Sequence, residues 1–529
     1  MPENIVEISS GKIRGNFVNS IYSFKGIPYG GATGWMNRFH QARKPGPWAG
    51  VRDAVNYGAR SPQRPGLMDR LAGSGGSTVK EIQSEDCLVL NVWTPALEDG
   101  RKRPVMFWCH GGGFTMGSGS ASIYDGTNLA RRGDVVVVTI NHRLGPLGYL
   151  YLGELAGEEF DKSGDAGMLD IVLALEWVRD NIASFGGDPH NVTIFGESGG
   201  GYKVSILMVM PAAAGLFHRA IVESGPGWRM MPREIATGQA RKLLKELGIT
   251  AANINKLYSL PAEQIIDAGR KVNHNLPFGW WPVVDGKVIP QHPFDPAAPD
   301  ISANIPLIIG TNKDEATLFL TAAYRRRRLG EGLAAELARK LWFRIAVRRI
   351  ARRIAGNSAS TFLASYRDER PHATNEDLFA AMMTDWMMRI PSIILAERKY
   401  AQHAAPVFMY LFSWETPILN GKLKATHGLE LPFVFDNIGK GLITGVGETQ
   451  SDLARNMSET WISFARSGVP DYTGIPEWPP YDTERRATMI FDVRCALESD
   501  PFKSERLAWN GIKPLDLGSM GSTGRSMVF

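Results

Sequence analysis

The serine in "NVTIFGESGGG" (191–201) lies among glycines, directly after a run of residues typical of a β-strand. Residues 196–200 fit the pattern G-x-S-x-G, in which a nucleophilic serine occupies a tight turn between a strand and a helix. The backbone approaches itself so closely there that only glycine is tolerated two residues before and two residues after the serine. A plain flexible turn with a solvated serine is the alternative. If Ser198 is a nucleophile, the chain must also supply an oxyanion site, a base and an acid.

The segment "HGGGF" (110–114) follows the apolar run "PVMFWC" and is the candidate for the oxyanion site. Glycines leave backbone N–H groups unobstructed, and a loop of this kind donates them to the oxyanion of a tetrahedral intermediate. A glycine-rich loop that merely allows a tight exit from the strand is the alternative. Because the segment occurs together with the Ser198 pattern, we interpret it as an oxyanion loop.

Eight short apolar runs are typical of strands covered by helices on both faces. Between them lie helical patterns, clearest at 167–189, where two glycines and Pro189 end the repeat. This alternation predicts an α/β fold on one large, mostly parallel sheet, in one domain with helical insertions. The apolar runs are 87–95, 104–111, 134–143, 191–196, 219–225, 305–312, 407–414 and 488–493.

The base is sought among the histidines that follow Ser198, because α/β enzymes with this turn place the residues in the order serine, acid, histidine. His218 precedes a strand too early for an acid to come before it. His372 lies in a charged loop and His403 near a helix end, where solvated histidines are expected. His427, in "KATHGLELPFVF", occupies a connecting segment beside a glycine, and such segments often carry functional groups. His427 is therefore the candidate base.

Two neighbouring acidic residues are candidates for the acid that accompanies Ser198 and the base. The run "IPLIIGTNKDEATLFL" (305–320) ends an apolar strand and then offers Asp314 and Glu315. Acids at the carboxyl end of a strand lie at the sheet edge where sites form in α/β proteins. Either acid alone is equally explained as a charge at a helix N-terminus. Composition does not choose between them.

Composition narrows the class of protein. Of 529 residues, 44% are hydrophobic and 21% charged, and the net charge of +5 gives no argument for nucleic-acid binding. Three cysteines, an odd number, argue against a disulfide framework. We see neither a secretory signal in the first residues nor an uncharged apolar stretch of the ~18 residues that span a bilayer. We therefore expect a soluble cytoplasmic protein.

Together the motifs resemble the type B carboxylesterase/cholinesterase family. The likeness covers residues 84–435 in the family's order, and "FKGIPYG" (24–30) and a plausible C-terminal region extend it to nearly the whole chain. It implies an α/β-hydrolase fold over residues 1–529 as a single domain. The motifs are "SEDCLVLNVWTP", "HGGGF", "NHRLGPLGYL", "FGGDPHNVTIFGESGGG", "GTNKDEATLFL" and "HGLELPFVF".

The resemblance implies a role for each candidate. Ser198 becomes the nucleophile, His427 the base, and Glu315, rather than Asp314, the acid. The implied reaction is ester hydrolysis through an acyl-enzyme, with neither metal nor cofactor. The N–H groups of the implied oxyanion hole belong to Gly112, Gly113 and Gly199.

Four further positions match family residues outside the triad. Glu197 matches a glutamate that influences the site electrostatically, and Ser224 matches a serine near the triad. Glu85 and Arg143 match an ion pair, to which we assign stability rather than chemistry.

Two positions depart from the family pattern. The cysteine that often pairs with Cys87 is absent, so that disulfide cannot form, in agreement with an intracellular enzyme of bacterial type. Gly199 replaces the usual alanine, and its N–H is retained.

Aromatic residues near these motifs suggest a pocket for a small to medium hydrophobic or aromatic ester. Ordinary core packing explains each of them about as well. The candidates are Phe114, Trp228, Trp280, Trp281 and Phe319.

Residues 325–353 carry eleven Arg or Lys and two Glu, a net charge of +9, with leucines and arginines each recurring every four residues. We expect a basic, amphipathic, lid-like helical insertion around 321–356. A solvated surface, docking to a membrane surface or partner, and steering of anionic esters are three interpretations of it.

Two other functions are alternatives to ester hydrolysis. Carbamate or amide hydrolysis could use the same residues, because it differs mainly in how the leaving group is protonated. A catalytically silent binding relative is the other class, but every catalytic position here is filled. The sequence specifies neither a preferred ester nor a choice between monomer and homodimer.

Overall fold

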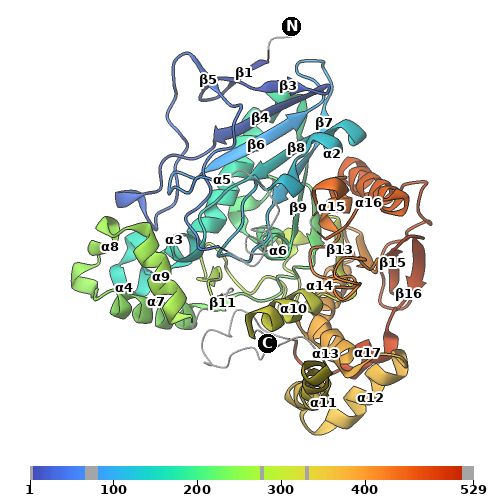
Figure 1. The fold of residues 1–529 in the computed structure, drawn as a ribbon. Coiled ribbons are helices and arrows are strands. Elements are labelled where there is room, and N and C mark those ends of the chain that lie inside the picture. Colours follow the sequence, from blue (N-terminus) through green and yellow to red (C-terminus); the bar gives the residue numbers. More distant parts are fainter. Residues whose placement is uncertain (1–3, 66–80, 274–278, 328–332, 442, 515–529) are drawn as a thin grey trace.

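The computed structural model describes residues 4–65, 81–273, 279–327, 333–441 and 443–514. Its centre is an 11-stranded sheet (Figure 1). Each of the eight apolar runs contributes a strand to it, and this prediction is confirmed. In spatial order the strands are β16 (Ala496–Ser499), β15 (Ala487–Phe491), β14 (Val407–Phe412), β13 (Leu307–Asn312), β10 (Arg219–Glu223), β9 (Gly187–Glu197), β7 (Arg103–Cys109), β8 (Val136–Ile140), β6 (Val89–Thr94), β4 (Ile21–Pro28) and β3 (Asn16–Val18).

The sheet is parallel from β15 through β8 and antiparallel at both ends. Parallel strands in register bring their carboxyl ends to one edge. That edge carries the segments after β7, β9, β10 and β13, and therefore the predicted oxyanion loop, Ser198, Ser224 and the acid pair. Two small sheets flank it, β1 (Ile5–Ile8) with β2 (Gly11–Arg14) and β5 (Val51–Asp53), and β11 (Met231–Pro232) with β12 (Val283–Val284).

Helices cover both faces of the sheet, which explains why its central strands are largely apolar. Along β7, Val105 and Phe107 face one core cluster while Met106 and Trp108 face the other. On the first face pack α5 (Ala166–Asn181), α6 (Gly199–Leu207) and α14 (Ile390–Tyr400). On the second pack α2 (Thr127–Gly133), α15 (Leu431–Val434) and α16 (Glu448–Ser467). The prediction of an α/β fold on one large, mostly parallel sheet is confirmed by this architecture.

Further helices surround the carboxyl edge of the sheet (Figure 1). On one side lie α3 (Gly145–Tyr149), α4 (Gly153–Ala156), α7 (Arg233–Glu246), α8 (Lys256–Ser259) and α9 (Ala262–Val272). On the other lie α10 (Ala316–Arg327), α11 (Leu333–Ala355), α12 (Ala359–Glu369), α13 (Asn375–Thr384) and α17 (Lys503–Ala508). Within the described ranges, one helical run, Asn375–Tyr400, is long and apolar enough to cross a bilayer, and 89% of its apolar window is buried in the protein.

The predicted ion pair between Glu85 and Arg143 is wrong. Arg38 donates two hydrogen bonds of 2.6 Å to the Glu85 carboxylate. Arg143 donates to Asp170 on α5 instead, from Nη2 at 2.6 Å and from Nε at 2.8 Å. Arg143 and Asp170 are both buried, and the bidentate hydrogen bonding between their side chains compensates both charges.

Where the structure describes it, the predicted basic region forms the end of α10 and most of α11, and its residues 328–332 lie outside the described residues. One side of α11 packs on α12 and α13 through Phe343, Val347 and Ile350. The opposite side exposes a second apolar ridge, in which Leu337, Leu341 and Ile345 are 57%, 59% and 45% exposed.

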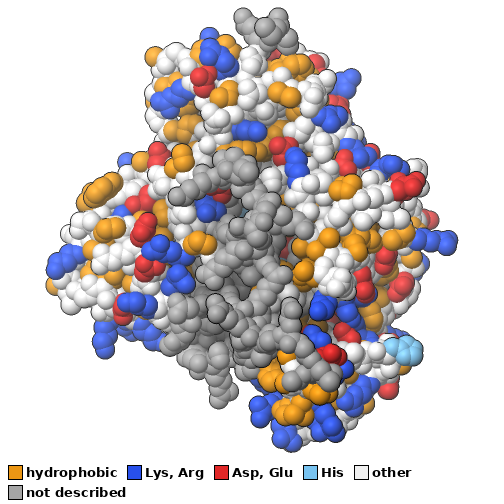
Figure 2. All heavy atoms as spheres, viewed as in Figure 1, with side chains coloured by type: hydrophobic (Ala, Val, Ile, Leu, Met, Phe, Trp, Pro, Cys, Tyr) orange, Lys and Arg blue, Asp and Glu red, His pale blue; other side chains and the backbone are white. Residues whose placement is uncertain are grey.

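Arginines adjoin the exposed ridge. Figure 2 shows basic and hydrophobic side chains together over this end of the molecule. None of the arginines has an ion-pair partner among the residues that the structure describes. They are Arg344, Arg348, Arg349 and Arg352, all exposed.

Candidate active site

Ser198 forms the turn between β9 and α6. Its φ of 56° and ψ of −122° lie in a region that residues with a side chain rarely adopt. The Ser198 N–H donates to the carbonyl of Glu223 at the end of neighbouring β10, with N···O 2.8 Å. Such strain is stored where the surrounding structure enforces it, commonly at functional sites. The plain flexible turn is therefore the poorer description of this segment.

The neighbouring glycines are required by contact with β7. A Cβ on Gly200 would lie 2.0 Å from the carbonyl oxygen of Cys109, and one on Gly196 would lie 2.7 Å from the same atom. Both contacts are with backbone, which cannot swing aside. The glycine spacing predicted for the turn is thus explained by its packing against the end of β7.

The oxyanion loop lies directly against this turn. Gly112 and Gly113 adopt positive φ values of 88° and 63°, which present their N–H groups without a side chain in the way. Within the described residues, the N–H groups of Gly112, Gly113 and Gly199 have no hydrogen-bond acceptor. Three unpaired donors beside a strained serine are what a developing oxyanion requires.

His427 lies between two glutamates. Its Nδ1 is 2.5 Å from Oε2 of Glu315, and the other Glu315 oxygen accepts the Asn312 N–H at 2.7 Å. Asp314 instead faces the Ala425 backbone, with N···Oδ2 3.4 Å. Of the two acids that the sequence left open, only Glu315 contacts the imidazole. No hydrogen bond joins His427 to Ser198 Oγ in the described residues; such bonds are often loose before a substrate is bound.

Glu197 lies on the other side of the ring. Its Oε1 is 3.2 Å from His427 Nε2 without hydrogen-bond alignment. Burial lowers the pKa of His427, but the Glu197 and Glu315 carboxylates outweigh it and raise that pKa. Burial also raises the pKa of Glu197. The protonation states of His427 and Glu197 therefore depend on each other.

We expect Glu197→Gln to move the acid limb of kcat/KM to lower pH by about 1–3 units. The imidazole must be neutral to accept a proton, and a neutral amide no longer raises its pKa. The pH profile of p-nitrophenyl ester hydrolysis measures the shift. The exposed carboxylate of β16 provides the control Glu498→Gln, which should leave the limb in place. An unmoved limb in Glu197→Gln would show that Glu197 does not act on His427.

Residues that sequence reasoning missed complete the surroundings. Trp461 donates Nε1–H to Glu223 Oε1 at 2.7 Å, and Asn312 binds Glu430, three residues after His427. Burial raises the pKa of Glu223 to about 8 and that of Glu430 well above its usual range. The position of Glu223 at the end of β10 and that of Glu430 in "HGLE" (427–430) were the available signals. Ser224 is buried at φ 47°, and its Oγ has no partner in the described structure.

The predicted pocket residues do not all gather at one place. The Phe319 ring lies 5.2 Å from the His427 ring, and Phe114 lies 5.1 Å from Trp281. Trp280 packs on Gly269 of α9, and Trp228 stacks with arginines. All but Phe319 are buried in the core.

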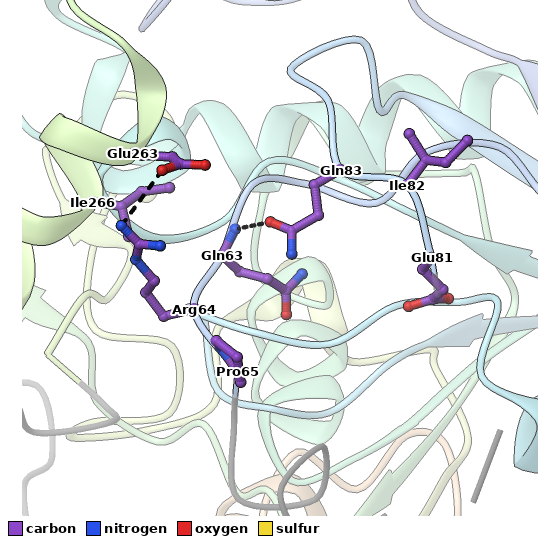
Figure 3. A pocket seen from close by; sticks show the side chains of 8 residues that line it. All are labelled: Gln63, Arg64, Pro65, Glu81, Ile82, Gln83, Glu263 and Ile266. Carbon is purple, nitrogen blue, oxygen red and sulfur yellow. Dashed lines mark hydrogen bonds and ion pairs between the residues drawn. The ribbon is translucent and has the colours of Figure 1, made fainter. Parts of the chain in front are cut away.

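A cavity of about 440 Å³ lies between the segments 63–65 and 81–83 and helix α9 (Figure 3). Gln63 on its wall exchanges two hydrogen bonds with Gly117, at 2.7 and 2.9 Å. None of its lining residues is a predicted site residue. They are Gln63, Arg64, Pro65, Glu81, Ile82, Gln83, Glu263 and Ile266. In the described ranges no group of three or more His, Cys, Asp or Glu is placed to hold a metal ion.

Comparisons with known proteins show the family of the chain. The model of the carboxylesterase family matches residues 2–507. Para-nitrobenzyl esterase of Bacillus subtilis (strain 168) is 36% identical over 520 residues, covering 96% of this chain and 98% of that protein. Phenmedipham hydrolase of Pseudarthrobacter oxydans is 32% identical, covering 92% and 94%. A carboxylesterase crystal structure from Geobacillus stearothermophilus superposes with a TM-score of 0.82 at 38% identity, covering 96% and 100%.

Proposed function

This chain belongs to the carboxylesterase family and is a carboxylic ester hydrolase, and from that premise we propose that Ser198, His427 and Glu315 perform the hydrolysis. The contact that carries the proposal is the 2.5 Å approach of His427 Nδ1 to Glu315, at the same sheet edge as the strained Ser198 turn. Replacing Ser198 tests it directly.

The proposed reaction has two halves. His427 accepts the Ser198 proton as Oγ attacks the ester carbonyl carbon, and Glu315 holds the imidazole and stabilises its positive charge. The N–H groups of Gly112, Gly113 and Gly199 stabilise the oxyanion. The intermediate then collapses, His427 protonates the departing alcohol, and a water molecule hydrolyses the acyl-enzyme by the same steps.

Small to medium hydrophobic or aromatic esters are the proposed substrates. The Phe319 ring beside His427 offers an apolar surface next to the reacting atoms. The name of one similar protein, a para-nitrobenzyl esterase, agrees with this class.

One catalytic domain over residues 1–529 is proposed, supported by the family model that matches residues 2–507, and 321–356 is proposed as a helical insertion in it. An intracellular location is likewise proposed, supported by three cysteines that are all free thiols.

The exposed face of α11 is proposed to contact an anionic lipid surface. Its exposed leucines and isoleucine would contact the acyl chains at the membrane boundary. Its arginines, which have no ion-pair partner among the described residues, would bind phosphate headgroups. Each such arginine contributes about 1 kcal/mol near an anionic membrane. The geometry thus favours docking over a merely solvated surface.

We expect the protein to sediment with phosphatidylglycerol vesicles and not with phosphatidylcholine vesicles. Changing Arg344, Arg348 and Arg352 together to Gln should weaken binding about 100-fold. A triple variant on α7, with the exposed Arg241, Lys242 and Lys245 changed to Gln, loses the same charge and should bind normally. Equal losses in the two variants, or self-association through the ridge instead of vesicle binding, would contradict docking by α11.

A further inference from the structure

Lys203 lies completely buried on α6, five residues after the serine. Its ammonium donates two hydrogen bonds of 2.9 Å, one to the carbonyl of His110 and one to the carbonyl of Gly113. These carbonyls bracket Gly111 and Gly112 in the oxyanion loop. Lys203 therefore links the helix that begins at the nucleophile to the loop that carries two of the proposed oxyanion donors.

Burying an ammonium group here costs free energy of desolvation unless its hydrogen bonds to the surrounding structure offset that cost. No carboxylate lies within 4 Å of Lys203 in the described residues, and burial lowers its pKa to about 7. The Phe114 ring, 5.3 Å from Nζ, closes the site on the loop side. An apolar residue would pack here without that cost, but it would leave both carbonyls without a donor.

Gly199 shows how closely the loop approaches the helix. A Cβ at this position would lie 2.3 Å from the Gly113 carbonyl oxygen and 2.5 Å from both its N and its Cα. The first residue of α6 thus touches the backbone of Gly113. Lys203 and Gly199 meet the same peptide of the loop, one by holding its oxygen and the other by leaving space for it.

We propose that Lys203 is a positioning residue that holds the oxyanion loop against α6, and that Gly199 supplies the space for that approach. The inference rests on the proposed function, in which Gly112 and Gly113 act from the loop and Gly199 from the helix. Three donors on two segments converge on one oxyanion only while the segments keep their spacing. A displacement of about 1 Å at such a site costs about 100-fold in rate.

The experiment compares Lys203→Met with the wild type, using an ester and a trifluoromethyl ketone. Ser198 Oγ adds to the ketone carbon and His427 takes the proton, so the adduct carries the oxyanion without a leaving group. We expect kcat to fall about 100-fold with KM nearly unchanged, and the ketone Ki to rise by the same factor. An unchanged Ki would overturn the inference.

A matched control is Ser205→Ala on the same helix. Ser205 is also buried, and its Oγ donates to Gly201 at 2.9 Å without touching the loop. It should lower Tm and leave the ketone Ki unchanged. If Lys203→Met lowers Tm and kcat without raising Ki, its role is structural only.

Gly199→Ala gives an independent reading, also if Lys203→Met does not fold. Its added methyl group should push Gly113 away and raise the ketone Ki about 100-fold. In the Lys203→Met background the loop is no longer held, so Gly199→Ala should raise the ketone Ki by a much smaller factor. If the double variant shows the full product of the two single-variant factors, the inference is overturned. An unchanged Ki in Gly199→Ala alone would also overturn it. Near-normal turnover in Ser198→Ala would instead refute the proposed function.

Discussion

Ser198→Ala is expected to lower kcat for a p-nitrophenyl ester by about 10⁶-fold. The methyl group cannot form the acyl-enzyme, and no other described hydroxyl occupies the strained turn between β9 and α6. The oxyanion loop remains, so a residual acceleration over water of about 10³-fold should persist. A steady-state assay with active-site-independent protein quantification measures the loss.

The same variant should keep its fold. Alanine meets the same backbone restriction as serine at φ 56°, and the N–H bond to Glu223 is unaffected, so Tm should stay close to that of the wild type. A fluorophosphonate, which forms a bond from Oγ to phosphorus as fluoride leaves, should label the wild type at Ser198 and not the variant. Near-normal turnover, or labelling elsewhere with full inactivation, would refute the nucleophile assignment.

Local spacing was sufficient to predict the turn, the loop and the strands. The need for glycine at 196 and 200 follows from any tight strand-to-helix turn, and the contact of both with Cys109 gives its physical cause. The apolar runs predicted strands because both faces of the parallel sheet are covered. In each case the pattern lies within a few residues, although the contact with Cys109 that explains the glycines joins segments far apart in the chain.

Partners distant in the chain were not predictable in this way. Lys203 binds carbonyls 90 and 93 residues earlier, and Asn312 binds Glu430, 118 residues later. The Glu85–Arg143 prediction failed for the same reason, since sequence shows that charges exist but not which of them meet. Only the packed fold brings such groups together.

Helix α11 shows a different limit. Two apolar ridges run along it, one through Leu337 and Leu341 and one through Phe343 and Val347. Periodicity alone predicts an amphipathic helix but does not decide which ridge is buried. The contacts with α12 and α13 select the second ridge and leave the first exposed beside the arginines.

Glu315→Gln is expected to lower kcat by about 10⁴-fold with little change in KM. The carboxylate accepts the Nδ1–H of His427 at 2.5 Å, so it fixes the tautomer whose Nε2 can receive the serine proton. An amide can offer its NH₂ group to Nδ1 and so stabilise the opposite tautomer, with the proton on Nε2. It also removes the negative charge that stabilises the imidazolium. The loss should therefore fall on the chemical step and appear in single-turnover kinetics.

Asp314→Asn is the matched comparison, because it changes the adjacent acid in the same way. Asp314 is buried too, and burial raises its pKa, but its Oδ2 faces the Ala425 N–H rather than the imidazole. We expect Asp314→Asn to keep kcat near the wild-type value while it alters Tm. Reversed results, with a large loss in Asp314→Asn and a small one in Glu315→Gln, would assign the acid to Asp314. Equal losses would show that the pair acts through the local fold rather than through one contact with His427.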